Sequence, residues 1–370
     1  MRTVGVEEEL MLVDPTTGVA SQTSAAVLRE HRRLVGEQPP SAAHELDAEL
    51  IQYMVETHTA PADNLDSIEE QLLTARQTTI AAAEAAGVAI AAVGHTVLPP
   101  DGPALIAPDD RYARIVHEFG PTARQAGTMG MHVHIAIDSP QEGVRAIDGL
   151  RPWLPLLVAI AANSPYADGV DTGYASWRQQ VWKRWPTAGP AEPFGSLAEY
   201  RRVTEALIAS GAALDAGMLY FDVRLAARYP TVEIRVADVC TDLGDGLLVT
   251  ALARALVETA AAGEAPPAVR SDLVRAALWR ASRSGLDGEL MHPHTGELAP
   301  AFDALGVLVE YVEPALTASG DLDRVSAGVE RLRMVGTGAR RLRQAYERGG
   351  SMSEVVADLV RRTAAEPGGH

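Results

Sequence analysis

The sequence is short of basic residues and of cysteine, and each shortage argues against a class of function. Its 370 residues carry 49 acidic and 32 basic side chains, which gives a formal net charge of −17. Nucleic acids and anionic membranes are bound by basic surfaces, so we expect neither as a partner. The one cysteine, Cys240, cannot form a disulfide within the chain, which indicates a reducing compartment.

Long apolar runs are also missing. The longest apolar stretch covers residues 153–162, is interrupted by Pro155, and is far shorter than the roughly 20 residues that span a bilayer. The first residues, Met-Arg-Thr-Val-Gly-Val-Glu-Glu-Glu, lack the cationic and apolar segments of a signal peptide. We therefore expect a soluble cytoplasmic protein.

Lysine is nearly absent, since Lys183 is the only one and the other 31 of the 32 basic residues are arginines. Lys183 lies in Trp-Lys-Arg-Trp, with neither a phosphate-binding glycine loop nor a kinase-like strand around it. P-loop and protein-kinase chemistry are therefore not expected. Any phosphate would have to be held by arginine, metal and backbone groups.

The chain changes character near residue 242. The patterns before it predict strands over 3–13, 50–59, 88–93, 131–137, 218–225 and 231–239, and helices over 24–34, 65–86, 150–162 and 197–209. A loop is predicted over 163–173 in this first part. The patterns after residue 242 predict helices over 247–261, 268–284, 300–316, 322–347 and 352–363, with a loop over 285–297. This order predicts an α+β protein whose helices lie at one side of an antiparallel sheet. We interpret residues 1–370 as a single catalytic domain, with a strand and helix core over 1–242, a helical part over 243–365 and a disordered tail over 366–370.

Paired glutamates open the chain in Gly5-Val-Glu-Glu-Glu-Leu10. Side chains alternate between the faces of a strand, so Glu7 and Glu9 share one face and Glu8 lies on the other. Two carboxylates side by side repel unless a cation lies between them, and such oxygen ligands suit Mg²⁺ or Mn²⁺. The alternative is a solvated edge strand with three surface glutamates.

Two later strands carry polar pairs of the same kind. His132 and His134 share one face of the segment 127–138, opposite an apolar face. They could bind a metal or form hydrogen bonds in a polar pocket. Glu233 and Arg235 share a face in the segment 228–238, where a carboxylate for a cation beside a guanidinium for an anion would suit a metal–triphosphate site. The alternative there is a structural ion pair.

Two further segments are less decisive. Glu49 and Glu56 lie seven residues apart, so they would face opposite sides of a regular strand and share a site only if the chain changes conformation between them. Arg178 ends a loop with aromatic neighbours, Asp171-Thr-Gly-Tyr-Ala-Ser-Trp-Arg178. An ordinary connecting loop is the alternative for this segment.

Taken in order, these segments resemble the carboxylate–amine ligase family of the glutamate–cysteine ligase superfamily, which is related in fold to glutamine synthetase. The matching pieces are Thr-Val-Gly-Val-Glu-Glu-Glu-Leu (3–10), Gly-Met-His-Val-His (130–134), Ala-Asn-Ser-Pro (162–165), the loop 171–178, Tyr-Pro-Thr-Val-Glu-Ile-Arg-Val-Ala-Asp (229–238) and Gly-Thr-Gly-Ala-Arg (336–340). The resemblance covers nearly the whole chain. It implies a curved, mostly antiparallel sheet that forms a funnel around ATP and divalent cations, with helices packed outside.

The resemblance also implies residue roles and a reaction. The metal ligands would be Glu7, Glu9, His132 and Glu233, with Glu56 as a further ligand and Glu49 as an additional acidic position. Arg178 and Arg235 would contact nucleotide phosphates and so serve catalysis, whereas His134 receives no role. The implied reaction is ATP- and Mg²⁺-dependent amide formation through an acyl phosphate. We interpret Cys240 as structural or incidental rather than catalytic.

The sequence leaves open the substrates and two alternative functions. L-Glutamate and L-cysteine are the first candidates, and another acid and amine from a specialised pathway are the second. A metal-dependent hydrolase could use the same carboxylates, but it would leave Arg178 and Arg235 without a phosphate. A non-catalytic relative that binds nucleotide or metal is the remaining rival, and a homodimer is expected from the resemblance.

Overall fold

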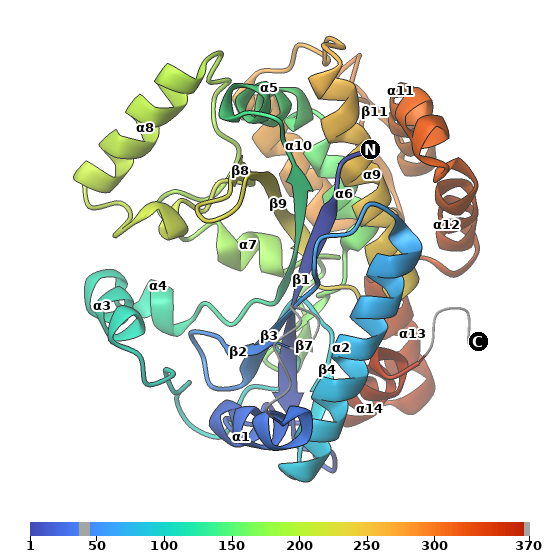
Figure 1. The fold of residues 1–370 in the computed structure, drawn as a ribbon. Helices are drawn as coiled ribbons and strands as arrows, with labels where there is room; N and C mark the ends of the chain where they lie inside the picture. The colour runs from blue at the N-terminus through green and yellow to red at the C-terminus, as the bar shows by residue number, and fades with distance from the viewer. Residues whose placement is uncertain (37–44, 366–370) are drawn as a thin grey trace.

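The computed structural model describes residues 1–36 and 45–365, and its centre is a seven-stranded antiparallel sheet (Figure 1). The strand order is β2-β3-β1-β5-β9-β8, and β4 pairs with the far end of β1. The strands are β1 (Val4–Val13), β2 (Leu46–Ala48), β3 (Met54–His58), β4 (Ala89–Ala91), β5 (Gly130–Ala136), β8 (Val223–Leu225) and β9 (Thr231–Asp238). Two small hairpins lie outside it, β6 (Tyr166–Ala167) with β7 (Val170–Asp171) and β10 (Glu289–Met291) with β11 (Leu298–Pro300).

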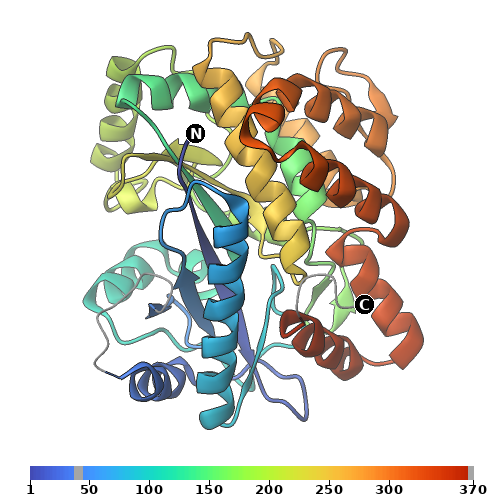
Figure 2. The ribbon, with the colours of Figure 1, turned by 45° about the vertical axis from the view of Figure 1, so that its right-hand side comes forward.

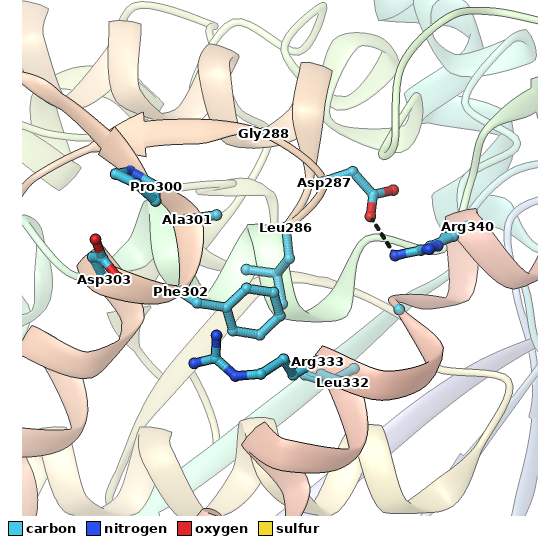
Figure 3. Close-up of a pocket in the computed structure, with 11 residues that line it drawn as sticks. Leu286, Asp287, Gly288, Pro300, Ala301, Phe302, Asp303, Leu332, Arg333 and Arg340 are labelled. Atoms are coloured by element: carbon cyan, nitrogen blue, oxygen red, sulfur yellow. Dashed lines mark hydrogen bonds and ion pairs between the residues drawn. The ribbon is translucent and has the colours of Figure 1, made fainter.

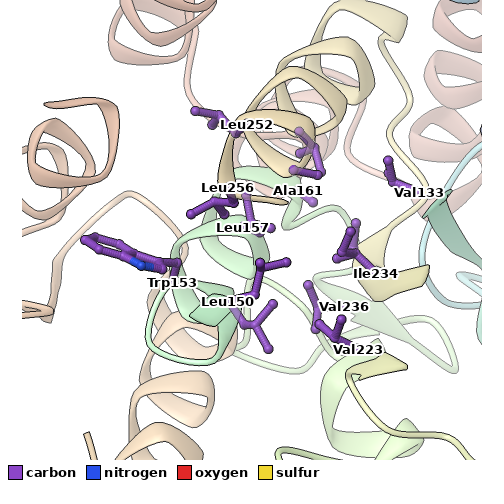
Figure 4. Close-up of a cluster of buried hydrophobic side chains, with 14 of the residues drawn as sticks. Val133, Leu150, Trp153, Leu157, Ala161, Val223, Ile234, Val236, Leu252 and Leu256 are labelled. Atoms are coloured by element: carbon purple, nitrogen blue, oxygen red, sulfur yellow. The ribbon is translucent and has the colours of Figure 1, made fainter. Parts of the chain in front are cut away.

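One face of the sheet is covered by helices α2 (Leu65–Ala85), α5 (Pro140–Leu150), α6 (Leu154–Ala161) and α9 (Leu243–Ala261). Figure 2 shows α2 and α9 side by side across it. Alternation along the strands turns Val133, Ile234 and Val236 toward these helices, where they meet Leu157 and Leu256 in the main apolar core (Figure 4). The opposite face, which we call the front face, is left for the polar side chains of the same strands.

The front side of the sheet carries the shorter helices. In Figure 1, α3 (Asp110–Phe119), α4 (Pro121–Arg124), α7 (Arg178–Trp182) and α8 (Leu197–Ala209) lie to the left of the sheet, opposite α2 and α9. The patterns of the sequence predicted α8 but missed α3, α4, α5 and α7. The predicted strand 218–225 was too long, because a 3-10 turn, η2 (Ala216–Met218), occupies its start.

The remaining helices are α1 (Ser24–Val35), α10 (Ser271–Ser284), α11 (Ala301–Ser319), α12 (Leu322–Val335), α13 (Gly338–Gly349) and α14 (Met352–Thr363). The prediction of one helix over 322–347 was wrong, because Gly336 adopts a φ of +80° and ends α12. Asp245 of α9 forms ion pairs with Arg331 of α12 and Arg341 of α13, so it holds both helices against α9.

The predicted α+β fold is confirmed, with an antiparallel sheet and helices in the C-terminal third. The predicted tail, 366–370, lies outside the described residues. Within 1–36 and 45–365, no helix is long and apolar enough to cross a membrane.

Candidate active site

Strand register gathers the polar residues of four strands on the front face. Glu7 of β1 lies opposite His132 of β5, Glu9 lies opposite Glu56 of β3, and Glu233 of β9 lies opposite both His134 of β5 and Arg224 of β8. Side chains directly opposite each other in an antiparallel pair share a face. The register therefore assembles one polar surface from segments that are far apart in the sequence.

Glu8 confirms the alternation, because it points to the helical face. Its carboxylate accepts two hydrogen bonds from Arg76 of α2, at 2.8 and 2.7 Å, and both side chains are almost fully buried. Arg76 also donates to the carbonyls of Cys240 and Thr241, just beyond β9. This bidentate pair fixes β1 against α2 and the end of β9.

Glu7 lies between two imidazoles. His132 Nδ1 is 3.0 Å from one of its oxygens and His134 Nε2 is 3.1 Å from the other. Burial alone would raise the pKa of Glu7, but the contacts with His132 and His134 outweigh it and hold the pKa below its ordinary range. Glu7 is therefore an ionised carboxylate at neutral pH.

His132 is held in the form that a metal binds. Burial and the nearby charge of Arg235 lower the pKa of His132 to about 4, so the ring is neutral at pH 7. With Nδ1 protonated and donating to Glu7, its Nε2 is an acceptor, and this buried atom has no hydrogen-bond partner. Glu9 lies 3.8 Å from that nitrogen. A carboxylate on one ring nitrogen and a free lone pair on the other is the usual arrangement of a metal-binding histidine.

Three carboxylates crowd together at one end of the front face. The hairpin between β2 and β3 provides the change of conformation that Glu49 and Glu56 require, since Glu49 follows β2 and Glu56 lies within β3. Oxygens of Glu9, Glu49 and Glu56 lie within 4.8 Å of one another. Burial and then the neighbouring Glu9 raise the pKa of Glu49 to about 7, while burial and Glu49 raise that of Glu56 well above its ordinary range. Burial and like charge therefore disfavour the ionised forms of Glu49 and Glu56 when no cation is bound.

Glu233 and Arg235 stand at the other end. Arg224 binds Glu233 through two hydrogen bonds of 2.7 and 3.0 Å, and Arg235 forms a further ion pair with the same carboxylate. Burial alone would raise the pKa of Glu233, but the two arginines outweigh it and hold the pKa low. The Arg235 guanidinium also lies 5.6 Å from the ring of Trp182 and 5.9 Å from that of Tyr220. It is a buried cation held by aromatic faces.

Arg178 lies beneath this surface rather than on it. Its side chain is fully buried, and its guanidinium donates to the carbonyls of Arg235 and Val236 at 3.2 and 3.4 Å. A β-carbon at Gly130 would collide with the end of this guanidinium, so a larger residue there would require Arg178 to shift. The structure thus brings Arg178 next to β5 and β9, and its contact with phosphate stays a prediction.

The donor set suits a hard divalent cation. Three overlapping groups have ligand atoms within 4.8 Å of one another: Glu7 with His134 and Glu233, Glu7 with Glu56 and His132, and Glu9 with Glu49 and Glu56. Carboxylate oxygens dominate all three groups, and a ring nitrogen of His134 or of His132 completes the first two. Oxygen-rich sets with an imidazole fit Mg²⁺ or Mn²⁺.

The six predicted ligands, Glu7, Glu9, Glu49, Glu56, His132 and Glu233, are all brought to the front face. Strand alternation placed His134 on the same face as His132, but it received no role from the sequence alone; in the structure it lies beside Glu7 and Glu233. Sequence reasoning left out Arg224. Nothing local indicated Arg224, since its role depends on β8 pairing with β9.

Comparisons with known proteins identify the family of the chain. The model of "Glutamate-cysteine ligase family 2 (GCS2)" matches residues 3–358. A protein of Frankia alni, provisionally named glutamate–cysteine ligase 2-2, is 50% identical over 374 residues, which cover 98% of this chain and 97% of that protein. One of Streptomyces coelicolor, provisionally named glutamate–cysteine ligase 2, is 46% identical over 99% of this chain and all of its own length.

A solved structure agrees at the level of the fold. The glutamate–cysteine ligase of Francisella tularensis, solved in complex with AMP, superposes with a TM-score of 0.71 at 14% identity, over 98% of this chain and 88% of that one. The chain therefore belongs to glutamate–cysteine ligase family 2 and is an ATP-dependent ligase.

Proposed function

We propose that the protein joins a carboxylic acid to an amine in an ATP- and Mg²⁺-dependent reaction that passes through an acyl phosphate. The observation that carries the proposal is the front face itself, where an oxygen-rich cluster and two imidazoles lie beside the buried cation Arg235. A nucleoside triphosphate with its metal ions needs both kinds of partner.

The proposed cation ligands are Glu7, Glu9, Glu49, Glu56, His132 and Glu233. We add His134 to this proposal because its Nε2 lies 3.1 Å from Glu7. When bound, Mg²⁺ or Mn²⁺ would neutralise the negative charge that phosphoryl transfer develops. The crowded carboxylates and the neutral His132 are consistent with such ions, because each gains a partner that the described residues do not supply.

The proposed reaction has two steps. First, a carboxylate oxygen of the acid attacks the γ-phosphorus of ATP, the bond to the bridging oxygen breaks, and ADP leaves. Second, the amine nitrogen attacks the acyl carbon, inorganic phosphate leaves, and the nitrogen loses its proton to form the amide. Neither step needs a serine or cysteine nucleophile, since phosphoryl transfer depends mainly on positioning and electrostatics. The buried thiol of Cys240 therefore has no part in it.

The two predicted arginines would differ in role. Arg235 lies on the front face and remains protonated, because Glu233 and Glu9 raise its pKa against the opposing effect of burial. We propose that it contacts the phosphates. The guanidinium of Arg178 donates to two carbonyls of β9. We therefore propose that its charge stabilises the ionised form of Glu9 and that its hydrogen bonds hold the backbone of Arg235 in position.

The names of the relatives make L-glutamate and L-cysteine the first substrates to test. A different acid and amine would leave the front-face chemistry unchanged. A metal-dependent hydrolase, the rival from another class, would leave Arg235 without a phosphate partner. The homodimer stays a prediction that this proposal does not require.

The test is ATP turnover with a panel of acids and amines, beginning with these two, read by mass spectrometry. We expect ADP, phosphate and a new amide mass only when acid, amine and Mg²⁺ are all present. Glu9→Gln and Glu233→Gln should abolish turnover with the fold intact, whereas Glu84→Gln, on the exposed side of α2, should not change it. Hydrolysis of an amide without ATP would contradict the proposal.

A further inference from the structure

A hollow lined by arginines lies on the side of the molecule that carries the C-terminal helices. Arg280 and Arg283 of α10 and Arg343 of α13 line it, together with Asp171 and Asp287, and its volume is about 540 Å³. Three guanidinium groups thus face two carboxylates, in a chain whose net charge is −17. None of the front-face residues lines this hollow.

The charges inside the hollow are incompletely paired. Arg343 binds Asp171 through two hydrogen bonds of 2.7 and 2.8 Å, which uses both oxygens of that carboxylate. Among the described residues, Arg280 pairs with one carboxylate, that of Glu289, at 3.9 Å. Arg283 forms no ion pair with any carboxylate in the described parts of the chain. Its guanidinium instead lies 5.4 Å from the ring of Tyr174.

A second chamber of about 350 Å³ adjoins the hollow and shares Asp287 and Gly288 with it (Figure 3). Its lining is apolar where Leu286, Phe302 and Leu332 meet, and Arg333 lies 4.4 Å from the ring of Phe302. Arg340 lies 3.5 Å from Asp287 across its edge. Gly336 and Arg340, the first and last residues of the Gly-Thr-Gly-Ala-Arg segment, also line this chamber.

Arg340, in the first turn of α13, adds a further guanidinium to the wall of the second chamber. The two chambers together therefore combine positive charge, guanidinium donors and an apolar wall.

We infer that this double chamber is a binding site for a small organic or inorganic anion that carries phosphate or carboxylate groups, separate from the front face. Its centre is Arg283, whose unpaired guanidinium can bind two oxygens of one such group. Arg280 and Arg343 lie on the same hollow and add charge. An apolar portion of the ligand would lie against Phe302 and Leu286. The inference does not depend on the ligase proposal.

The test is isothermal calorimetry on the full chain at low salt, with inorganic pyrophosphate as one probe and citrate as the other. The protein is first treated with EDTA so that metal-dependent binding at the front face is absent. The EDTA is dialysed away before the titration, because it is itself a polycarboxylate and would compete with the probes. We expect one site per chain, weakened about tenfold or more by Arg283→Ala and partly restored by Arg283→Lys. Arg275→Ala, which removes an exposed arginine of the same helix outside the hollow, should bind as the wild type does.

The two probes identify the chemistry of the ligand, since tighter pyrophosphate indicates a phosphate and tighter citrate a carboxylate. No binding of either probe at millimolar concentration would overturn the inference. Binding that survives Arg283→Ala but is lost in Arg235→Lys would also overturn it, because the anion would then lie on the front face.

Discussion

Removing one of the crowded carboxylates should stabilise the metal-free protein at alkaline pH. Burial and the neighbouring Glu9 raise the pKa of Glu49 from an ordinary value near 4.5 to about 7. A carboxyl whose pKa is raised in the folded state binds its proton more tightly there than in the unfolded chain. It therefore costs stability as the pH rises from the unfolded pKa to the folded one.

The size of this cost follows from the shift. Each pKa unit corresponds to about 1.4 kcal/mol, so the ionised Glu49 costs at most about 3 kcal/mol at pH 8 and less than about 1 kcal/mol at pH 5. Glu49→Gln keeps the shape of the side chain and removes the ionisation. We expect the variant to exceed the wild type in free energy of unfolding by an amount of this order at pH 8, and by little at pH 5.

The assay is urea unfolding at the two pH values, in EDTA and again with Mn²⁺. The control is Glu84→Gln, since Glu84 is exposed on α2, away from the cluster. Added Mn²⁺ should stabilise the wild type by binding its folded state, and should stabilise Glu49→Gln less. A variant that is no more stable than the wild type in EDTA at pH 8, or equally more stable at both pH values, would refute the reasoning.

Three further predictions concern the same surface. Because the pKa values of Glu49 and Glu56 are raised, cation binding must displace protons, so Mn²⁺ affinity should rise between pH 6 and pH 8. Calorimetry in two buffers of different ionisation enthalpy would detect the proton release, and an Mn²⁺ affinity that does not change with pH would contradict the prediction. Arg76→Met leaves the buried Glu8 unpaired and should cost about 3–5 kcal/mol in urea unfolding; a loss below about 1 kcal/mol would show that the pair does not hold β1. Arg224→Ala removes the two hydrogen bonds that orient Glu233 and should reduce turnover and Mn²⁺ affinity together, so unchanged Mn²⁺ affinity would remove Glu233 from the cation site.

Local patterns predicted the polar face, because strand alternation depends only on neighbouring residues. The expected strand 3–13 became β1 (Val4–Val13), and alternation placed Glu7 and Glu9 on one face with Glu8 on the other, as the Arg76 contact shows. The predicted helix 65–86 likewise became α2 (Leu65–Ala85).

Features that depend on pairing between distant segments could not be predicted. The contact of Arg224 with Glu233 requires the register of β8 against β9, and the cluster of Glu49 with Glu56 requires a hairpin that the sequence does not mark with a turn signal. The break at Gly336 was missed for another reason. Apolar residues continue at helical spacing across it, so periodicity alone extended α12 into α13.

The measurement that tests the central claim most directly is the transfer of an oxygen atom from acid to phosphate. The acid substrate, L-glutamate first, would be labelled with ¹⁸O in its carboxylates and incubated with ATP, Mg²⁺ and the amine, and the released phosphate analysed by mass spectrometry. An acyl phosphate predicts one ¹⁸O in each phosphate released with amide formation. Amide formation that leaves the phosphate unlabelled would contradict the account.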